Sequence, residues 1–105
     1  MPAARDRNDK HYGGIAPAGS NNEAGCVRVT PENPRRTMLF IQNTGTNAGL
    51  VRFEEPIQGD GSDMLFVGGS GILWDRADTV PQSAINVGSL LGTTFAVIEQ
   101  VGPPQ

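Results

Sequence analysis

Residues that form turns interrupt this chain about every ten positions, and they restrict it to short extended segments. The 105 residues include 14 glycines and 8 prolines, which are spread along the chain and form no repeat. A helical bundle needs long uninterrupted segments, so this distribution excludes it. The stretches between the turns are short apolar runs, a pattern that predicts β-strands.

The apolar runs predict about seven short strands within residues 26–101. In the strongest run every position of residues 38–41 is apolar, which is typical of a strand covered on both of its faces. We therefore expect an all-β fold, a small antiparallel β-sandwich or barrel of jelly-roll type with an extended N-terminal arm. The expected core consists of apolar strand residues: Val27, Val29, Leu39, Ile41, Val51, Phe53, Trp74, Phe95 and Val97.

The first 25 residues differ from the rest in composition. They are rich in charged residues, glycine and proline, and their only sizeable apolar side chains are Tyr12 and Ile15. Such a segment buries too little apolar surface to offset the entropy lost on ordering. We therefore predict an extended arm at residues 1–25, a β domain at 26–101 and a C-terminal tail at 102–105. A neighbouring subunit should hold the arm through its polar and bulky side chains: Arg5, Arg7, Lys10, His11, Tyr12 and Ile15.

The charges are divided unevenly along the chain, whose formal net charge is −3. Basic residues outnumber acidic ones in the first third, and the remainder is acidic, which suits electrostatic contact between subunits. Arg35 and Arg36 are either a second contact with an acidic partner surface or solvated charges at a strand edge. The β domain lacks the basic stripe that nucleic acid requires and the run of about 18 apolar residues of a membrane span.

The residues that could support catalysis do not form a convergent set. The only histidine, His11, lies in the predicted arm, and the only cysteine, Cys26, is interpreted as a small inert thiol. Glu54 and Glu55 are adjacent on a strand and point to opposite faces, which excludes a glycosidase-type pair. Residues 60–63 (DGSD) contain only part of a calcium-loop pattern, so we interpret them as a solvated turn. We expect no enzymatic activity, no cofactor, no metal and no small-molecule substrate.

Two sequence blocks resemble a known group of proteins. Residues 36–45 (RTMLFIQNTG) open the β domain and residues 92–99 (GTTFAVIE) close it, with a glycine-rich turn at 68–71 and PQSAI at 81–85 between them. This order is similar to small all-β virion proteins of tailed bacteriophages, over roughly residues 35–100. The resemblance implies a capsid decoration or cement protein on the surface of the virion, assembled in the host cytoplasm. It would act as a homodimer or homotrimer bound to the major capsid protein, and it implies no catalytic residues.

Two alternative functions stay open at this point. One is an accessory virion protein of the tail, neck or fibre attachment. The other is a small carbohydrate- or peptide-binding β-sandwich module. An exposed Trp74 beside a groove would favour the binding module, whereas a buried Trp74 would count against it.

Overall fold

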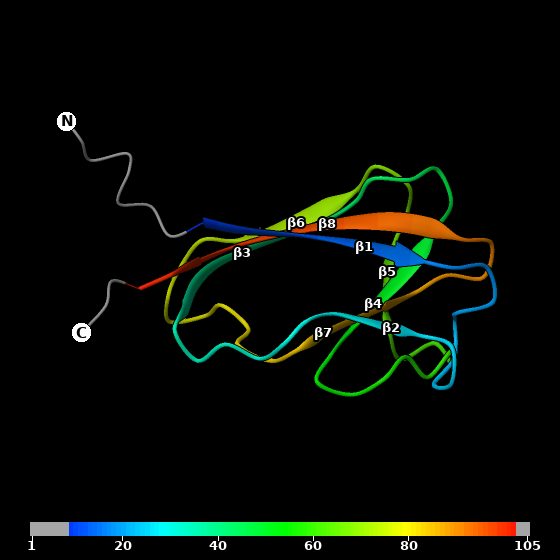
Figure 1. The fold of residues 1–105 in the computed structure, drawn as a ribbon, viewed down its shortest axis with the longest axis horizontal. Coiled ribbons are helices and arrows are strands. Elements are labelled where there is room, and N and C mark those ends of the chain that lie inside the picture. Colours follow the sequence, from blue (N-terminus) through cyan, green and yellow to red (C-terminus); the bar gives the residue numbers. More distant parts are fainter. Residues whose placement is uncertain (1–8, 103–105) are drawn as a thin grey trace.

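The computed structural model describes residues 9–102, which form eight strands and no helix. The strands build two four-stranded antiparallel sheets that face each other (Figure 1), a first sheet in the order β1-β8-β3-β6 and a second in the order β2-β7-β4-β5. This arrangement confirms the predicted all-β sandwich or barrel. The strands are β1 (Asp9–Ala16), β2 (Val27–Thr30), β3 (Arg36–Asn43), β4 (Gly49–Phe53), β5 (Met64–Phe66), β6 (Gly71–Trp74), β7 (Ile85–Gly88) and β8 (Thr93–Val101). The described residues contain no helix that is long and apolar enough to cross a membrane.

The strand β1 corrects the predicted N-terminal arm. It pairs with β8 along its whole length, from Asp9 opposite Gln100 to Ala16 opposite Thr93. The segment that follows also contacts the domain, through a bridge between Ala18 and Ser89. A ladder of backbone hydrogen bonds to a preformed strand orders a segment that has few apolar side chains of its own. A separate arm is therefore wrong for residues 9–16, while residues 1–8 and 103–105 lie outside the described part of the chain.

The hydrophobic core lies between the two sheets and contains the strand residues expected from the sequence. Five of them are almost fully buried, namely Leu39, Ile41, Val51, Phe95 and Val97. The other four are partly buried and pack against the core, namely Val27, Val29, Phe53 and Trp74. Two aromatic pairs join the sheets edge to face, with ring centroids 5.7 Å apart for Phe53 and Trp74 and 6.0 Å apart for Phe66 and Phe95. The interior is therefore a packed apolar layer.

The end of the core near the β3–β4 turn is closed by buried Asn43. Its amide donates to the carbonyl oxygens of Asn47 and Phe66, each at 2.9 Å. Its carbonyl oxygen accepts from the Gly45 backbone N–H at 3.0 Å and from the Thr93 hydroxyl at 2.7 Å. These four bonds satisfy both N–H donors and both lone pairs of the Asn43 side-chain amide. Since two of the partners, Phe66 and Thr93, belong to strands of different sheets, Asn43 holds the two sheets together.

Candidate functional site

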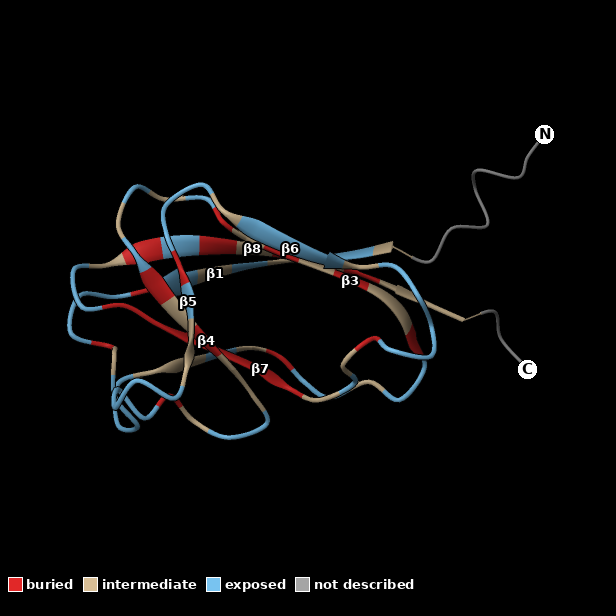
Figure 2. Cartoon of the chain, turned by 180° about the vertical axis from the view of Figure 1, so that it is seen from behind, coloured by how far each residue is buried: buried red, intermediate tan, exposed pale blue. Residues whose placement is uncertain are grey.

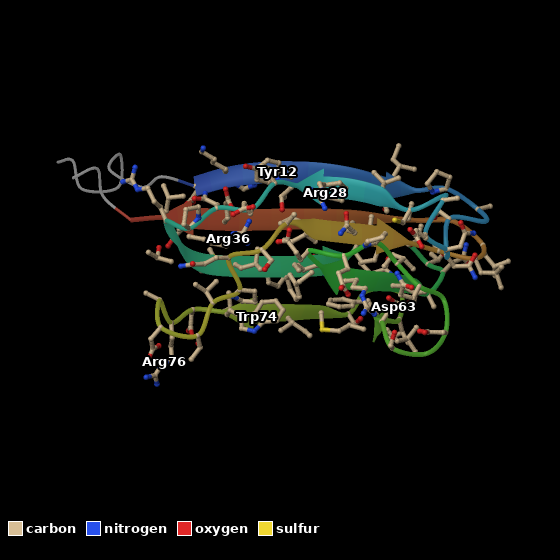
Figure 3. The ribbon with its side chains drawn as sticks, turned by 90° about the horizontal axis from the view of Figure 1, so that it is seen from below. Tyr12, Arg28, Arg36, Asp63, Trp74 and Arg76 are labelled. Atoms are coloured by element: carbon tan, nitrogen blue, oxygen red, sulfur yellow. The ribbon has the colours of Figure 1, made fainter. Side chains whose placement is uncertain are left out.

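Four residues of the predicted interface lie on β1, and their side chains alternate across the first sheet. His11 and Ile15 are exposed and point outward, and Lys10 is also exposed. Tyr12 is half-buried and points inward, where its hydroxyl donates to Glu99 Oε2 at 3.1 Å (Figure 3). Burial and this hydrogen bond to Glu99 raise the pKa of Tyr12. The two remaining arm residues, Arg5 and Arg7, lie outside the described residues.

The structure places Arg36 inside the domain and not at an interface. Its Nε lies 2.7 Å from Glu99 Oε1, and both residues are only 1% exposed. A bulge between Arg36 and Met38 interrupts the regular pairing of β3 with β8 and accompanies this inward placement. The terminal guanidinium nitrogens donate to three backbone carbonyl oxygens, those of Pro31, Pro81 and Ser83. Arg35, by contrast, is exposed and donates to the Gly102 carbonyl oxygen at 3.1 Å.

The pair of Arg36 and Glu99 is a structural clamp. Glu99 Oε2 accepts from the Asn33 amide at 3.1 Å in addition to the Tyr12 hydroxyl. Each charge is therefore paired and each carboxylate oxygen is hydrogen-bonded, which is what a buried ion pair requires. Such a saturated arrangement leaves neither group available to a substrate.

A pocket of about 300 Å³ lies beside the clamp, but it lacks groups for acid–base chemistry. Its only charged side chains are those of two arginines, whose guanidinium groups donate hydrogen bonds and accept none. General acid–base catalysis needs a group that titrates near the working pH. The full lining consists of Pro34, Arg35, Arg36, Thr37, Ala77, Gln82 and Gly102.

The loop at residues 60–63 is anchored by hydrogen bonds within the chain. The Asp63 carboxylate accepts from the backbone N–H groups of Gln58 and Gly59, at 3.2 and 2.8 Å, and from the Arg52 guanidinium at 3.3 Å. The Asp63 side chain is only 1% exposed, so the expected solvated turn is correct for exposed Asp60 and incorrect for Asp63. Hydrogen bonds from Ser62 lower the pKa of Asp60. Among residues 9–102 no three His, Cys, Asp or Glu side chains are grouped so that they could hold a metal.

The centre of the outer face of the second sheet is polar and is covered by the chain's own loops, whereas Leu65 on its edge strand is exposed. At its centre Asn86 is buried and donates to the Glu55 carbonyl oxygen at 2.7 Å, and Arg28 donates to the Glu54 carbonyl oxygen at 2.9 Å. The loop that carries these carbonyls runs along the outside of the sheet (Figure 1), and Ile57 within it is fully buried. The loop thus covers the centre of this outer face and leaves its β5 edge exposed.

The outer face of the first sheet has the opposite character, because it is apolar and nothing in the described chain covers it. Residues directly opposite each other on paired strands share a face. Since Leu39 and Ile41 point inward, Phe40 points outward, and so do its partners Ile98 and Leu73. We define the outer face of the first sheet by these strand positions and their outward neighbours: Asp9, His11, Gly13, Ile15, Met38, Phe40, Gln42, Gly71, Leu73, Thr94, Ala96, Ile98 and Gln100.

This face is unusual in its lack of charge, since Asp9 at one corner is its only acidic or basic residue apart from His11. A row of opposed residues, His11, Ile98, Phe40 and Leu73, crosses all four strands. Leu73 is 55% exposed, and Figure 2 shows β6 largely exposed, in contrast to the buried β7 of the other sheet. An antiparallel sheet facing water normally places polar residues outward. The face is therefore the candidate functional surface of the described chain.

Sequence reasoning detected part of this surface and missed the rest. The apolar run at residues 38–41 correctly indicates a strand with two apolar faces. In the structure, other parts of the chain cover only one of these two faces of β3, the inner one. The contributions of Ile98 and Leu73 were missed, because only the strand register shows that they flank Phe40. Trp74, which the sequence placed in the core, packs edge to face against Phe53 at the core periphery, and this counts against the carbohydrate- or peptide-binding module.

Comparison with known proteins identifies the fold. No protein family profile matches the chain, and no curated protein matches it. Similar solved structures include the Cupin_2 domain of an XRE family transcriptional regulator from Enterobacter cloacae, with a TM-score of 0.56 and 11% identity over 97% of this chain and 90% of that one. A de novo designed double-stranded β-helix has a TM-score of 0.51 and 15% identity, over 86% of this chain and 97% of the design.

A third similar structure is an HTH_3 family transcriptional regulator from Vibrio cholerae. It has a TM-score of 0.57 and 12% identity, and the match covers 99% of this chain and 48% of the other. The chain thus spans about half the length of that regulator. Identities this low establish the fold alone, which is that of cupin domains and of the double-stranded β-helix.

These similarities overturn the function expected from the sequence. The similar structures named above are a cupin domain, a designed double-stranded β-helix and a transcriptional regulator, and none of these is a virion protein. The prediction of a phage capsid decoration protein is therefore wrong. The strand and turn sequences that suggested it are common to many small β domains, so they indicate the fold and carry no information about its use.

Proposed function

We propose that this chain is a non-catalytic association domain that joins protein chains through the outer face of the first sheet. The observation that carries the proposal is the run of three apolar side chains, Ile98, Phe40 and Leu73, across a face whose only ionisable residues are Asp9 and His11. On the second sheet, by contrast, the centre of the outer face is polar and is covered by a loop. Leaving large apolar side chains in water is unfavourable, at roughly 25 cal/mol for each Å². Contiguous exposed apolar surface of this kind marks protein interaction sites.

The interior supports the non-catalytic part of the proposal. The space between the sheets is filled by apolar side chains such as Leu39, Val51 and Phe95. The buried polar groups that remain, Arg36, Glu99 and Asn43, are hydrogen-bonded to other parts of the chain. A catalytic site needs a nucleophile, base or electrophile that can meet a substrate, and the pocket beside Arg36 offers only arginines as ionisable groups.

The similar structures agree with an accessory role. A cupin domain of this size exists as one part of an XRE family transcriptional regulator, so the fold occurs in nature joined to other protein units. We infer a comparable accessory role for this chain, in which its outer face binds protein surface.

The experiment places a photo-crosslinking amino acid, p-benzoylphenylalanine, at position 73 in one variant and at position 65 in another. Leu73 and Leu65 both lie on edge strands and are similarly exposed, at 55% and 65%, but they belong to different sheets. Illumination of the native host that expresses the full chain should give a protein adduct from position 73 and little from position 65. Absence of any protein adduct from position 73 would contradict the association function.

A further inference from the structure

We propose that the partner on the outer face of the first sheet is a second copy of this chain, which packs its own outer face against it around a two-fold axis. The inference rests on the proposed association function and adds the identity of the partner. Two sheets that pack face to face interdigitate outward-pointing side chains at a spacing of about 10 Å. In a two-fold dimer the same surface serves both subunits, so it must be self-complementary.

The small number of charges on this face favours a partner surface that is also nearly uncharged. Asp9 and His11 are the only ionisable residues on the outer face, and both lie toward one corner, on β1. A strongly charged partner would therefore find charges to pair with only at this corner, and it would lose hydration of its own charges over the rest of the face. The best-matched surface is one that is itself neutral and apolar, and the same face of another copy meets this condition.

The rest of the chain also favours self-association through this face in particular. The chain carries a formal net charge of −3, so two copies repel each other through their acidic surfaces. Acidic side chains such as Glu54, Glu55 and Asp60 lie in the loop beside the second sheet. Contact through the first sheet keeps these groups away from the partner copy and hydrated, which lowers the cost of bringing two like-charged molecules together.

The face is large enough for a weak dimer interface. Three strands of about eight residues and the four residues of β6, at about 4.8 Å between strands and 3.4 Å per residue, give a flat footprint of roughly 450 Å². Protruding side chains increase the accessible area above this footprint, and stable interfaces bury about 800 Å² on each partner, with weak ones somewhat less. Phe40, Ile98 and Leu73 occupy the middle row, where the residues that contribute most to binding usually lie.

The chain's own N-terminal residues are a poorer occupant. Residues 1–8 read MPAARDRN, and three of the eight are charged. Their apolar content is one methionine, one proline and two alanines, which supplies too little apolar area to replace water over four strands. A second copy supplies an equal apolar face without ordering an additional polar segment.

The test is the solution mass of the full chain and of three variants, measured by sedimentation equilibrium over a wide dilution series. The wild type should approach twice the chain mass of 11.1 kDa. Leu73→Lys should raise the dissociation constant at least about a hundredfold, because each dimer would bury two unpaired charges. Leu65→Lys is the matched control, since it adds the same charge to the edge strand of the other sheet, and it should leave the dissociation constant within about threefold of the wild type.

A milder variant covers the case in which Leu73→Lys does not fold. Ile98→Thr keeps a β-branched residue at the centre of the face and removes apolar area, so it should fold and weaken the dimer about tenfold. Folding of every variant is checked by circular dichroism. A dimer that survives both face variants would overturn the proposal and place the contact elsewhere, for example on the exposed backbone edge of β1. Loss of the dimer in Leu65→Lys alone would overturn it as well.

A wild type that stays monomeric at all concentrations would also overturn the second-copy inference, without deciding the association function. The crosslinking experiment then separates the two. An adduct of position 73 with a different protein would keep the association function and reject self-association. An adduct with the mass of two copies would support both.

Discussion

The buried ion pair between Arg36 and Glu99 permits a quantitative prediction from the substitution Glu99→Gln. Glutamine keeps the shape of the side chain and removes its charge, so Arg36 becomes an unpaired buried cation. Breaking a buried pair in this way costs about 3–5 kcal/mol. Arg36 keeps its bonds to three backbone carbonyl oxygens, and glutamine Oε1 can still accept from its Nε. The glutamine Nε2 would then face the Asn33 amide, which also donates, so we expect a loss of at least about 3 kcal/mol in the free energy of unfolding.

The measurement is urea unfolding at a fixed protein concentration, followed by fluorescence of Trp74 and by circular dichroism. Trp74 is the only tryptophan and packs against Phe53 across the two sheets, so its emission reports separation of the sheets. Constant concentration matters because any association adds to the apparent stability. For a domain of this size about 3 kcal/mol corresponds to a drop of roughly 12–20 °C in Tm.

The matched control is Asp78→Asn in the surface pair of Arg76 and Asp78. Its atoms lie 3.4 Å apart and its side chains are 74% and 70% exposed, and Figure 3 shows Arg76 pointing away from the body. Exposed pairs contribute little, so this variant should stay within about 0.5 kcal/mol of the wild type. A loss below about 1 kcal/mol for Glu99→Gln, with an unchanged m-value, would refute the assignment of the pair as a buried clamp.

Three further predictions concern single positions. Tyr12→Phe should make the free energy of unfolding less sensitive to pH above about pH 10. The raised pKa of Tyr12 gives stability that is present below that pH and is lost as the hydroxyl of the folded protein ionises. If the free energy of unfolding of the variant fell with rising pH as steeply as that of the wild type in an alkaline urea series, this prediction would be wrong. Gly88→Ala should lose at least about 2 kcal/mol, because its Cβ would collide with the Ser20 carbonyl oxygen, and normal stability in the same titration would show that the backbone there yields. Glu54→Gly should gain about 0.5–1 kcal/mol because Glu54 has a φ of 69°, and a lower Tm than the wild type in calorimetry would count against it.

Local sequence patterns were sufficient for most strands of the domain. The apolar run at residues 38–41 lies within β3, and all but the first residue of the closing block at 92–99 lie within β8. Alternating apolar residues separated by glycine and proline turns predict these strands because side chains of a strand point to opposite faces in turn. The same alternation identified buried residues such as Leu39 and Val97.

Interactions between distant residues decided the features that sequence reasoning missed. Residues 9–16 lack the apolar pattern of a strand, and they are ordered by backbone pairing with β8, which begins 77 positions after the end of β1 at Ala16. Arg36 is read from the sequence as a surface charge, and it is buried because Glu99 and three carbonyl groups converge on it.

The candidate interface shows the same division between local and tertiary information. The sequence by itself determined that β3 is apolar on both faces and that the chain forms an all-β domain, since both follow from side-chain alternation and turn chemistry. The tertiary structure decided that Phe40 lies between Ile98 and Leu73, and that loops cover the second sheet and not the first. The physical reason is that strand order and register depend on pairing between segments far apart in the chain, which no local pattern encodes.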